Sequence, residues 1–250
     1  MRILIVNSNT SEVVTGKVEP VARAAASPGT EVVAVTGTFG PRVIGTRAEN
    51  AIAEHSTLAL LARHAAGCDA ALIAVSYDTG LRAARELFDI PIVGMTEAGL
   101  LTACMLGGSI GVVTFGRRVL PLYREVIAGY GLERRIAGWR VMESTAAYRA
   151  GAHPELDREL VAAANDLVDK DGAEVILITG AVMAGVPARL QPQVPVPIVD
   201  CIVCGVHQAE LLARMRFPKP RAGSYASPAG REMVEVEPAI ARAFAPKEKS

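Results

Sequence analysis

Apolar residues in this chain gather in short, uninterrupted runs, and longer segments that suit helices separate them. The clearest runs are residues 72–75 and 175–178. Runs of Val, Ile and Leu of this length are typical of parallel strands that are buried on both faces. Each run breaks into small and polar residues, as happens at the carboxyl edge of a parallel sheet, where ligands bind. We therefore expect residues 75–78 and 179–182 to form two facing sides of one cleft.

The same alternation continues along the chain and restarts once. Ile3 to Ile110 is 107 positions, Asp69 to Glu174 is 105, and Pro91 to Pro197 is 106. Three offsets this similar indicate a duplicated unit of strands and helices. The pattern predicts an α/β fold with two pseudosymmetric Rossmann-like lobes, each a parallel sheet covered by helices, with a cleft between them. We expect lobe 1 to comprise residues 1–97 plus about 207–250, and lobe 2 to comprise residues 98–206.

Composition and charge limit the classes of partner that the protein is expected to bind. Half of the 250 residues are apolar and 21% are charged, which is typical of a globular chain. Lys plus Arg and Asp plus Glu both number 26, so no net field favours nucleic acid or an anionic membrane. The apolar run around 175–186 is too short to span a bilayer, and MRILIV lacks a signal-peptide cleavage region. We expect a cytoplasmic protein with reduced cysteines, which binds neither nucleic acid nor membrane.

Polar residues directly follow the first and third expected strands. In residues 7–10 (NSNT), Asn9 and Thr10 offer donors that suit an oxygen of a carboxylate, imide or ureide, although the stretch also suits a helix N-cap. Three residues at the end of the third strand are candidates for orienting substrate or relaying a proton: Ser76, Tyr77 and Asp78. The structural alternative is a turn in which Asp78 caps the next helix.

The opposite side of the expected cleft has small side chains. Beyond Thr179, the backbone amides of Gly180, Ala181 and Val182 could cradle an oxyanion, or the stretch could be ordinary tight packing. Asp200 ends another strand, where it either caps the next helix or faces the cleft.

Several familiar site motifs are incomplete or absent. Cys201, Cys204 and His207 follow one helix face and are one ligand short of a structural zinc site, so we expect no metal. No G-x-G-x-x-G follows the first strand and no Walker sequence occurs, so we expect no nucleotide cofactor.

A set of stretches resembles the Asp/Glu/hydantoin racemase superfamily, and within it the hydantoin and allantoin racemase branch. They are MRILIVNSNTS at the start, GPRVIG at 40–45, DTGLRAARE at 78–86, IPIVGMTEAG at 90–99, DGAEVILITG at 171–180, VPIVD at 196–200 and YASP at 225–228. The resemblance covers nearly the whole chain. It implies a cofactor-independent enzyme with two pseudosymmetric lobes, which acts on small carboxylates, hydantoins or similar ureides and assembles into a homo-oligomer.

The chain departs from this family at two positions. The resemblance implies a two-base mechanism with one cysteine thiolate on each face of the carbon acid, in the patterns A-C-x-x-D-x-G and G-C-A-G-M. Val75 and Gly180 stand where those cysteines are expected. Neither residue can accept a proton, and a general base contributes about 10²–10⁴-fold to a rate. We therefore expect thiol-based racemisation to be lost, while the scaffold and its oxygen-binding loops remain.

Three hypotheses are compatible with this departure. The first is an enzyme on the same substrate class with non-thiol chemistry, such as hydrolytic opening of a cyclic imide, lactam or ureide that uses Ser76, Tyr77 or Asp78. The second is a racemase or isomerase with substitute groups, for example Tyr77 opposite Asp200 or Thr179. The third is a protein that binds a small ligand and has lost catalysis.

Overall fold

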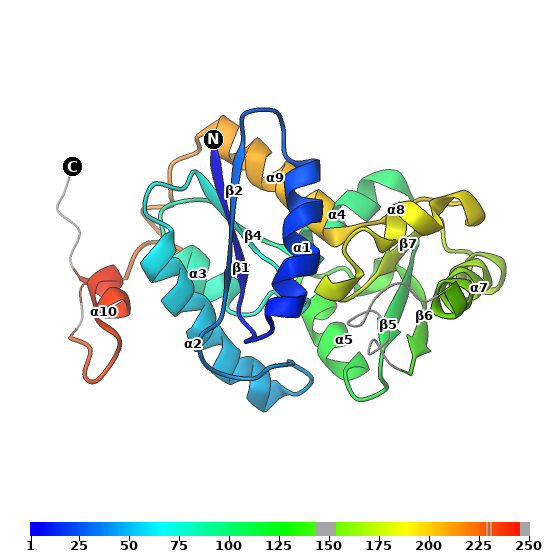
Figure 1. The fold of residues 1–250 in the computed structure, drawn as a ribbon, viewed down its shortest axis with the longest axis horizontal. Coiled ribbons are helices and arrows are strands. Elements are labelled where there is room, and N and C mark those ends of the chain that lie inside the picture. Colours follow the sequence, from blue (N-terminus) through cyan, green and yellow to red (C-terminus); the bar gives the residue numbers. More distant parts are fainter. Residues whose placement is uncertain (144–153, 229, 231, 246–250) are drawn as a thin grey trace.

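The protein consists of two parallel four-stranded sheets, each covered by helices. The computed structural model describes residues 1–143, 154–228, 230 and 232–245. The strand orders are β2-β1-β3-β4 and β6-β5-β7-β8, and every pairing is parallel. Figure 1 shows the two sheets side by side, with helices around each. The predicted α/β fold with two lobes is confirmed.

The first sheet is built from the amino-terminal part of the chain. Its elements are β1 (Arg2–Asn7), α1 (Glu12–Ala25), β2 (Glu31–Thr36), α2 (Arg47–His64), β3 (Ala70–Ile73), α3 (Leu81–Leu87) and β4 (Ile92–Gly94). All four residues of β3 are buried, as the uninterrupted apolar run predicted.

The second sheet repeats this order. Its elements are α4 (Met95–Leu106), β5 (Ile110–Phe115), α5 (Leu120–Gly129), η1 (Glu133–Arg135), β6 (Ile136–Met142), α7 (Pro154–Asp171), β7 (Val175–Ile178), η2 (Ala181–Met183), α8 (Val186–Leu190), η3 (Gln191–Gln193) and β8 (Ile198–Val199), followed by α9 (Cys201–Met215) and α10 (Pro238–Phe244). The register repeats as well: Ile3 pairs with Ala70 in the first sheet, and Ile110 pairs with Val175 in the second.

Two helices interlock the lobes. α4 follows the last strand of the first sheet but packs on β7 and β8, whereas α9 follows the last strand of the second sheet but packs on β1, β3 and β4. Glycines allow the close approach: a Cβ at Gly205 would lie 2.5 Å from Leu72 Cδ1, and one at Gly99 would lie 2.6 Å from Cys201 Sγ. The boundaries predicted at 97/98 and near 207 fall inside these two helices, and the division into domains stays a prediction.

Candidate active site between the lobes

A cavity of about 280 Å³ opens where the carboxyl ends of β3 and β7 meet. Val75 lies two residues beyond β3 and Gly180 two residues beyond β7, and both line this cavity. Other predicted site residues also line it: Asn9, Ser76, Tyr77, Ala181 and Val182. The predicted residues outside its lining are Thr10, Asp78, Thr179 and Asp200. The two expected sides of one cleft therefore do face a common space.

The backbone makes an equivalent turn on each side of the cavity. The N–H of Asp78 donates to the carbonyl of Val75 at 2.9 Å, and the N–H of Met183 donates to the carbonyl of Gly180 at 2.9 Å. Within the described residues, the N–H groups of the two residues between these partners, 76–77 on one side and 181–182 on the other, donate no hydrogen bond. Unpaired N–H groups beside a cavity are suited to binding the oxygen atoms of a ligand.

Gly180 makes the second turn different from the first. Its φ is +101°, in a region that only glycine adopts readily. Space alone would admit a side chain there, because the nearest atoms to an added Cβ are Met183 Cγ at 3.7 Å and Val182 Cγ2 at 3.8 Å. The backbone conformation, and not crowding, is therefore what suits this position to glycine.

Two phenols from opposite lobes lie together at the cavity. The rings of Tyr77 and Tyr123 have centroids 4.9 Å apart at an angle of 49°. Burial raises the pKa of Tyr123 to about 12, against the hydroxyls of Ser76 and Thr179, which lower it. Burial, and after it the neighbouring Tyr123, raises the pKa of Tyr77 well above its ordinary value. Both phenols therefore stay protonated at neutral pH and are hydrogen-bond donors.

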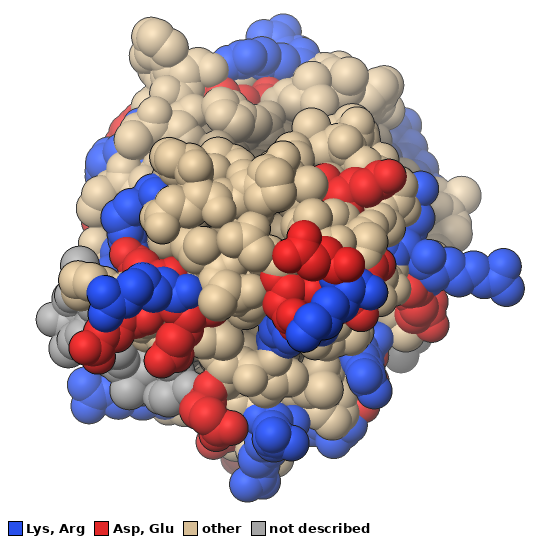
Figure 2. Space-filling model, turned by 90° about the vertical axis from the view of Figure 1, so that its right-hand side faces the viewer, with Lys and Arg blue, Asp and Glu red and all other residues tan. Residues whose placement is uncertain are grey.

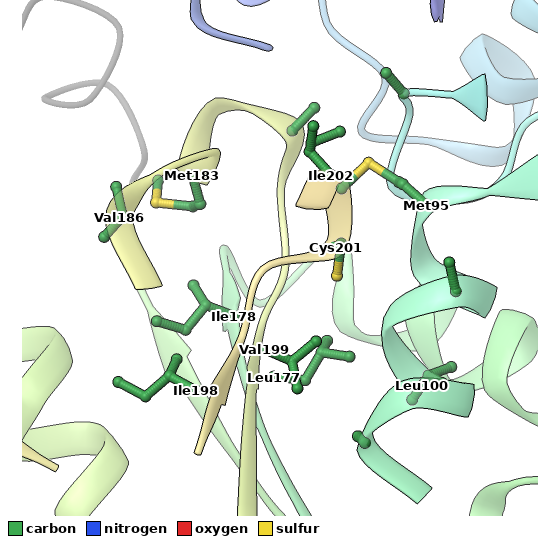
Figure 3. Close-up of a cluster of buried hydrophobic side chains, with 14 of the residues drawn as sticks. Met95, Leu100, Leu177, Ile178, Met183, Val186, Ile198, Val199, Cys201 and Ile202 are labelled. Atoms are coloured by element: carbon green, nitrogen blue, oxygen red, sulfur yellow. The ribbon is translucent and has the colours of Figure 1, made fainter. Parts of the chain in front are cut away.

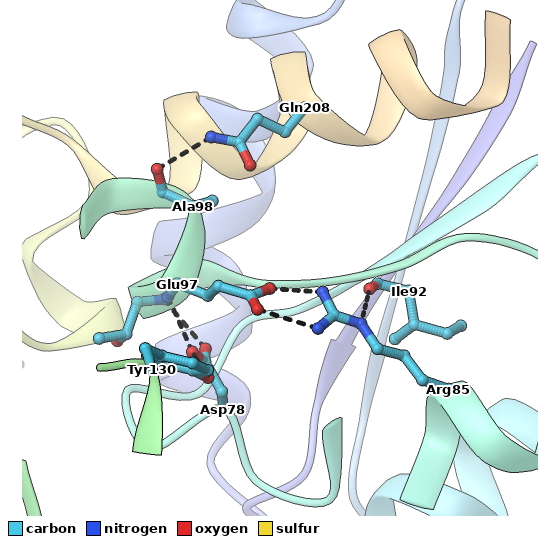
Figure 4. Close-up of polar contacts among 8 residues, drawn as sticks. Asp78, Arg85, Ile92, Glu97, Ala98, Tyr130 and Gln208 are labelled. Carbon is cyan, nitrogen blue, oxygen red and sulfur yellow. Dashed lines mark hydrogen bonds and ion pairs between the residues drawn. The ribbon is translucent and has the colours of Figure 1, made fainter. Parts of the chain in front are cut away.

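Asp78 caps a helix rather than facing this cavity. Its Oδ1 accepts from the N–H of Thr96 at 2.9 Å, and its Oδ2 accepts from the N–H of Glu97 at 2.8 Å and from the hydroxyl of Tyr130 at 2.6 Å (Figure 4). Burial raises its pKa to about 7, although these three hydrogen bonds lower it. Asp78 and Tyr77 both line a second cavity of about 530 Å³ between α2, α3 and α5.

Asp200 caps a helix in the second lobe, as Asp78 does in the first. Its Oδ1 accepts from the N–H groups of Ile202 at 2.9 Å and Val203 at 3.2 Å, at the start of α9. Its Oδ2 accepts from the N–H of Gly185 at 2.7 Å. Burial raises the pKa of this carboxyl, against the three backbone hydrogen bonds. Both oxygens are occupied by the helix start and the loop beside it.

The remaining predicted binding residues differ in their access to the cavity. Asn9 lines it, whereas the backbone N–H of Thr10 donates to the carbonyl of Pro41 at 3.1 Å and holds the loop above. The Thr179 hydroxyl is buried and, within the described residues, has no hydrogen-bond partner of good geometry. It lies beside Tyr123, whose pKa it lowers.

Charge reaches the cavity from its exposed side. Arg42 and Glu143 both line it and are exposed, and Glu143 lies 3.9 Å from Arg117. On the outer face of the second lobe, basic and acidic side chains lie close together, and the described residues visible there form no large patch of one sign (Figure 2).

Within the described ranges, no group of three or more His, Cys, Asp or Glu side chains could hold a metal ion. None of the described helices has the length and apolar character that crossing a membrane requires.

Comparison with known proteins agrees with this architecture. Residues 3–209 match the family model described as Asp/Glu/Hydantoin racemase. The chain belongs to this family. It is 30% identical over 236 residues to the hydantoin racemase of Pseudomonas sp. (strain NS671), which covers 94% of each chain.

Two solved structures of the family are similar over nearly their whole length. The allantoin racemase from Pseudomonas fluorescens is 31% identical, with a TM-score of 0.87 over 94% of this chain and 100% of the other. The allantoin racemase from Klebsiella pneumoniae is 27% identical, with a TM-score of 0.90 over 96% and 98% of the two chains. The resemblance to the hydantoin and allantoin branch is confirmed.

The sulfur atoms of this family member lie away from the cavity. All four cysteines are in the described part of the chain, and none lines the cavity. The Cys201 side chain points into the apolar cluster around Leu177 and Val199 (Figure 3), and burial raises its pKa well above the ordinary value. Cys201 and Gly180 do border a common crevice, but it has no room for a water molecule.

Several cavity residues were not predicted from the sequence. Tyr123, Phe115 and Val119 come from β5 and the start of α5, and no local motif marks them. Arg42 belongs to the stretch at 40–45, whose resemblance to the family does not indicate a role for this side chain. Residues 42–45 of this stretch line the cavity.

Proposed function

We propose that this family member acts without a cofactor on a small cyclic ureide, imide or lactam, or on a small carboxylate, bound between Val75 and Gly180. The observation that carries the proposal is that these two residues line one cavity of about 280 Å³, whereas none of the four cysteines does. Valine and glycine side chains accept no proton, so chemistry at this place must use other groups.

The substrate class rests on the relatives and on the donors around the cavity. The relatives are named for hydantoin and allantoin, which are cyclic ureides with carbonyl oxygens. Such oxygens can accept hydrogen bonds from the unpaired N–H groups of the two turns and from the protonated phenols of Tyr77 and Tyr123. At the exposed side Arg42 adds a positive charge that would pair with a carboxylate substituent, and Glu143, which also lines the cavity, adds a negative one.

Hydrolytic ring opening is the reaction that this set of groups supports best. The N–H groups of Ala181 and Val182 would stabilise the oxyanion that forms when a nucleophile adds to a ring carbonyl. Ser76 would act as that nucleophile or position the water, and the Tyr77 hydroxyl would accept the proton of the attacking oxygen as it passes its own proton to the leaving nitrogen, so that the phenol stays neutral. The reaction adds one water across the C–N bond of the ring. Asp78 would contribute indirectly, by holding the start of α4.

Racemisation with substitute groups is a second candidate. It is favoured by the 30% identity over 94% of both chains to a protein named hydantoin racemase. Tyr77 opposite Thr179 or Asp200 would exchange the proton. The raised pKa of Tyr77 and the three backbone hydrogen bonds to Asp200 weigh against this pair. A third candidate, binding without conversion, is favoured by the protonated state of both cavity phenols.

The test is incubation with hydantoin, a benzyl-substituted hydantoin, allantoin, succinimide and malonate in deuterated water. Mass spectrometry and chiral chromatography then report the products. We expect a ring-opened product that has gained one water. Deuterium at the α-carbon of an intact ring would establish racemisation. A ligand that raises the melting temperature and is recovered unchanged would establish binding alone.

Tyr123→Phe sharpens this test, because it removes a donor hydroxyl and keeps the ring. If Tyr123 helps to hold the oxyanion, kcat is expected to fall about 10²-fold. The matched control is Tyr225→Phe, since Tyr225 lies 36% exposed in the carboxy-terminal segment and outside the cavity lining. An equal loss in both variants would contradict the role of Tyr123.

The cytoplasmic location, the homo-oligomer and the lack of a nucleic-acid partner stay predictions. Cell fractionation, light scattering at several protein concentrations and a nucleic-acid binding assay test them in turn.

A further inference from the structure

Asn9 enters the cavity with a fixed orientation of its side-chain amide. Its Oδ1 accepts from the Nδ2 of Asn7 at 3.1 Å and from the backbone N–H of Ser11 at 2.9 Å. Because a backbone N–H can only donate, the oxygen of the amide must be the atom that faces Ser11. The Nδ2 of Asn9 is not fully enclosed and donates to no group within the described residues. The amide therefore presents N–H bonds to the cavity.

Asn7 is locked in the same way. It is 1% exposed, and its Nδ2 donates towards Asn9 Oδ1, the Ser11 carbonyl at 3.2 Å and Thr15 Oγ1 at 3.0 Å. A carbonyl can only accept, so the nitrogen of Asn7 must face Ser11. The Oδ1 of Asn7 is left buried without a partner within the described residues, which costs free energy. The surrounding acceptors impose this orientation in spite of that cost.

A chain of hydroxyls gives the network its direction. Thr36 donates its only hydroxyl proton to the carboxylate of Glu12 at 2.9 Å. In the 2.6 Å contact between the two threonine hydroxyls, Thr15 must therefore be the donor. Thr15 Oγ1 has then spent its proton and can only accept from Asn7. Glu12 thus determines the direction of the hydrogen bonds from Thr36 to Asn7, and the backbone of Ser11 fixes the same orientation of Asn7 and the orientation of Asn9.

We propose that Asn7 is a positioning residue: the hydrogen bonds that run from Glu12 through Thr36 and Thr15 hold it so that Asn9 presents a donor to the cavity. A ligand must then place a carbonyl or carboxylate oxygen at this point, and an N–H group there is rejected. The inference deepens the proposed function, because it names the substrate group that the first lobe recognises.

Among the described residues, the second lobe has no equivalent of the hydrogen bonds that orient Asn7 and Asn9. Thr114, the next-to-last residue of β5, lies 107 positions after Asn7, the last residue of β1. Its hydroxyl is buried and, within the described residues, has no hydrogen-bond partner. Within the part of the chain that the structure describes, an amide therefore selects an acceptor in the first lobe and not in the second, which would orient the substrate in one sense between two otherwise similar lobes.

Binding of hydantoin to the whole protein tests this proposal through three variants. Asn9→Asp keeps the shape and both accepted hydrogen bonds but turns an acceptor to the cavity, so Kd is expected to rise at least about tenfold. Thr15→Val removes the hydroxyl that aligns Asn7 and is expected to raise Kd about threefold. Thr15→Ser, its matched control, is expected to keep the wild-type Kd.

A double-mutant cycle separates positioning from a general effect on structure. In an Asn9→Ala background, Thr15→Val is expected to leave Kd unchanged, because the group through which it acts is gone. A loss of the same size in both backgrounds would overturn the proposal.

NMR of the side-chain amides needs no ligand. We expect the NH₂ protons of Asn9 to exchange rapidly with water and those of Asn7 slowly. Thr15→Val is expected to accelerate exchange at Asn7 and to shift the Asn9 resonances, whereas Thr15→Ser does neither. Slow exchange at Asn9, or no response of either amide to Thr15→Val, would overturn the proposal.

The failure of this inference is distinguishable from that of the proposed function. If hydantoin neither binds nor reacts while the NMR pattern is as expected, the proposed function is contradicted, whereas the positioning of Asn9 by Asn7 is supported. If hydantoin binds Asn9→Asp as tightly as the wild type, the proposed role of Asn7 and Asn9 is overturned, whether or not the protein converts hydantoin.

Discussion

In both lobes a carboxylate caps the helix that follows the last strand of the sheet, α4 in the first lobe and α9 in the second. The carboxylate comes from a different segment in each lobe. In the first lobe, α4 begins after Gly94, and Asp78 from the loop after β3 caps it. A Cβ at Gly94 would lie 2.4 Å from Asp78 Cγ, so the carboxylate occupies the space of the missing side chain. In the second lobe, Asp200 caps its own helix, and Gly185 from the loop after β7 donates to it.

The exchange shows what the duplicated fold holds constant. Gly94 has φ −90° and ψ 138°, and Asp200 has φ −93° and ψ 112°, so the two helices begin from similar backbone conformations. The carboxylate at the helix start is retained, while the residue that carries it has changed. A capping role for Asp78 and Asp200 therefore follows from the comparison of the lobes, and the proposed chemistry is assigned to the residues that line the cavity.

The largest effect expected from this comparison is on stability. Asp78→Ala leaves two N–H groups and the Tyr130 hydroxyl buried without their acceptor, which is expected to cost about 3 kcal/mol of unfolding free energy. Asp200→Ala removes a cap that is only half-buried and is expected to cost about 1 kcal/mol. Urea denaturation measures both. A smaller loss for Asp78→Ala than for Asp200→Ala would contradict the account.

Transplanting the arrangement of the second lobe into the first tests the exchange itself. Asp78→Gly removes the cap, and Gly94→Asp alone places its carboxylate against Asp78. Combined, the two changes are expected to recover about 2 kcal/mol relative to Asp78→Gly, because the new aspartate caps its own helix as Asp200 does. Denaturation of the single and double variants is the measurement. Additive losses would show that the two lobes are not interchangeable here.

The two positions expected for family cysteines are predicted to differ in their tolerance of one. Gly180→Cys puts a side chain on a backbone with φ +101° and is expected to cost about 2 kcal/mol. Val75→Cys replaces one small apolar side chain by another and is expected to cost about 1 kcal/mol. Thermal and urea unfolding report both costs, and an equal tolerance would argue against strain at Gly180.

A further expected effect is a dependence of stability on pH. The pKa of Asp78 is about 7 in the folded protein and about 4 in an unfolded chain. The folded state therefore binds a proton more tightly, and the free energy of unfolding should fall as pH rises from about 4 to 7. Asp78→Asn should remove more of this fall than Asp200→Asn, since Asp78 is the more deeply buried. Unfolding at pH 5, 6, 7 and 8 measures the slopes.

The fold could be predicted because its signals are local. Buried parallel strands need uninterrupted apolar runs. Residues 72–75 and 175–178 are such runs, so they predict two buried strands without information from the rest of the chain. The repeated spacing then gives two lobes. The crossing of α4 and α9 onto each other's sheets could not be read in this way, because it depends on packing between segments about a hundred residues apart.

The candidate site could be predicted only in part, for a related reason. A polar residue at a strand end has the same local sequence whether it faces a cavity, as Asn9 does, or caps a distant helix, as Asp78 does. The choice depends on where α4 begins. Tyr123 comes from a helix in the other lobe, and nothing in its own neighbourhood marks it.

The most direct test of the central claim is a crystal structure with hydantoin bound. We expect the ring to lie between Val75 and Gly180, with a ring oxygen on Asn9 Nδ2 and no cysteine sulfur within about 4 Å of any ring carbon. A ring seated elsewhere, or one with the sulfur of Cys201 against a ring carbon, would contradict the account.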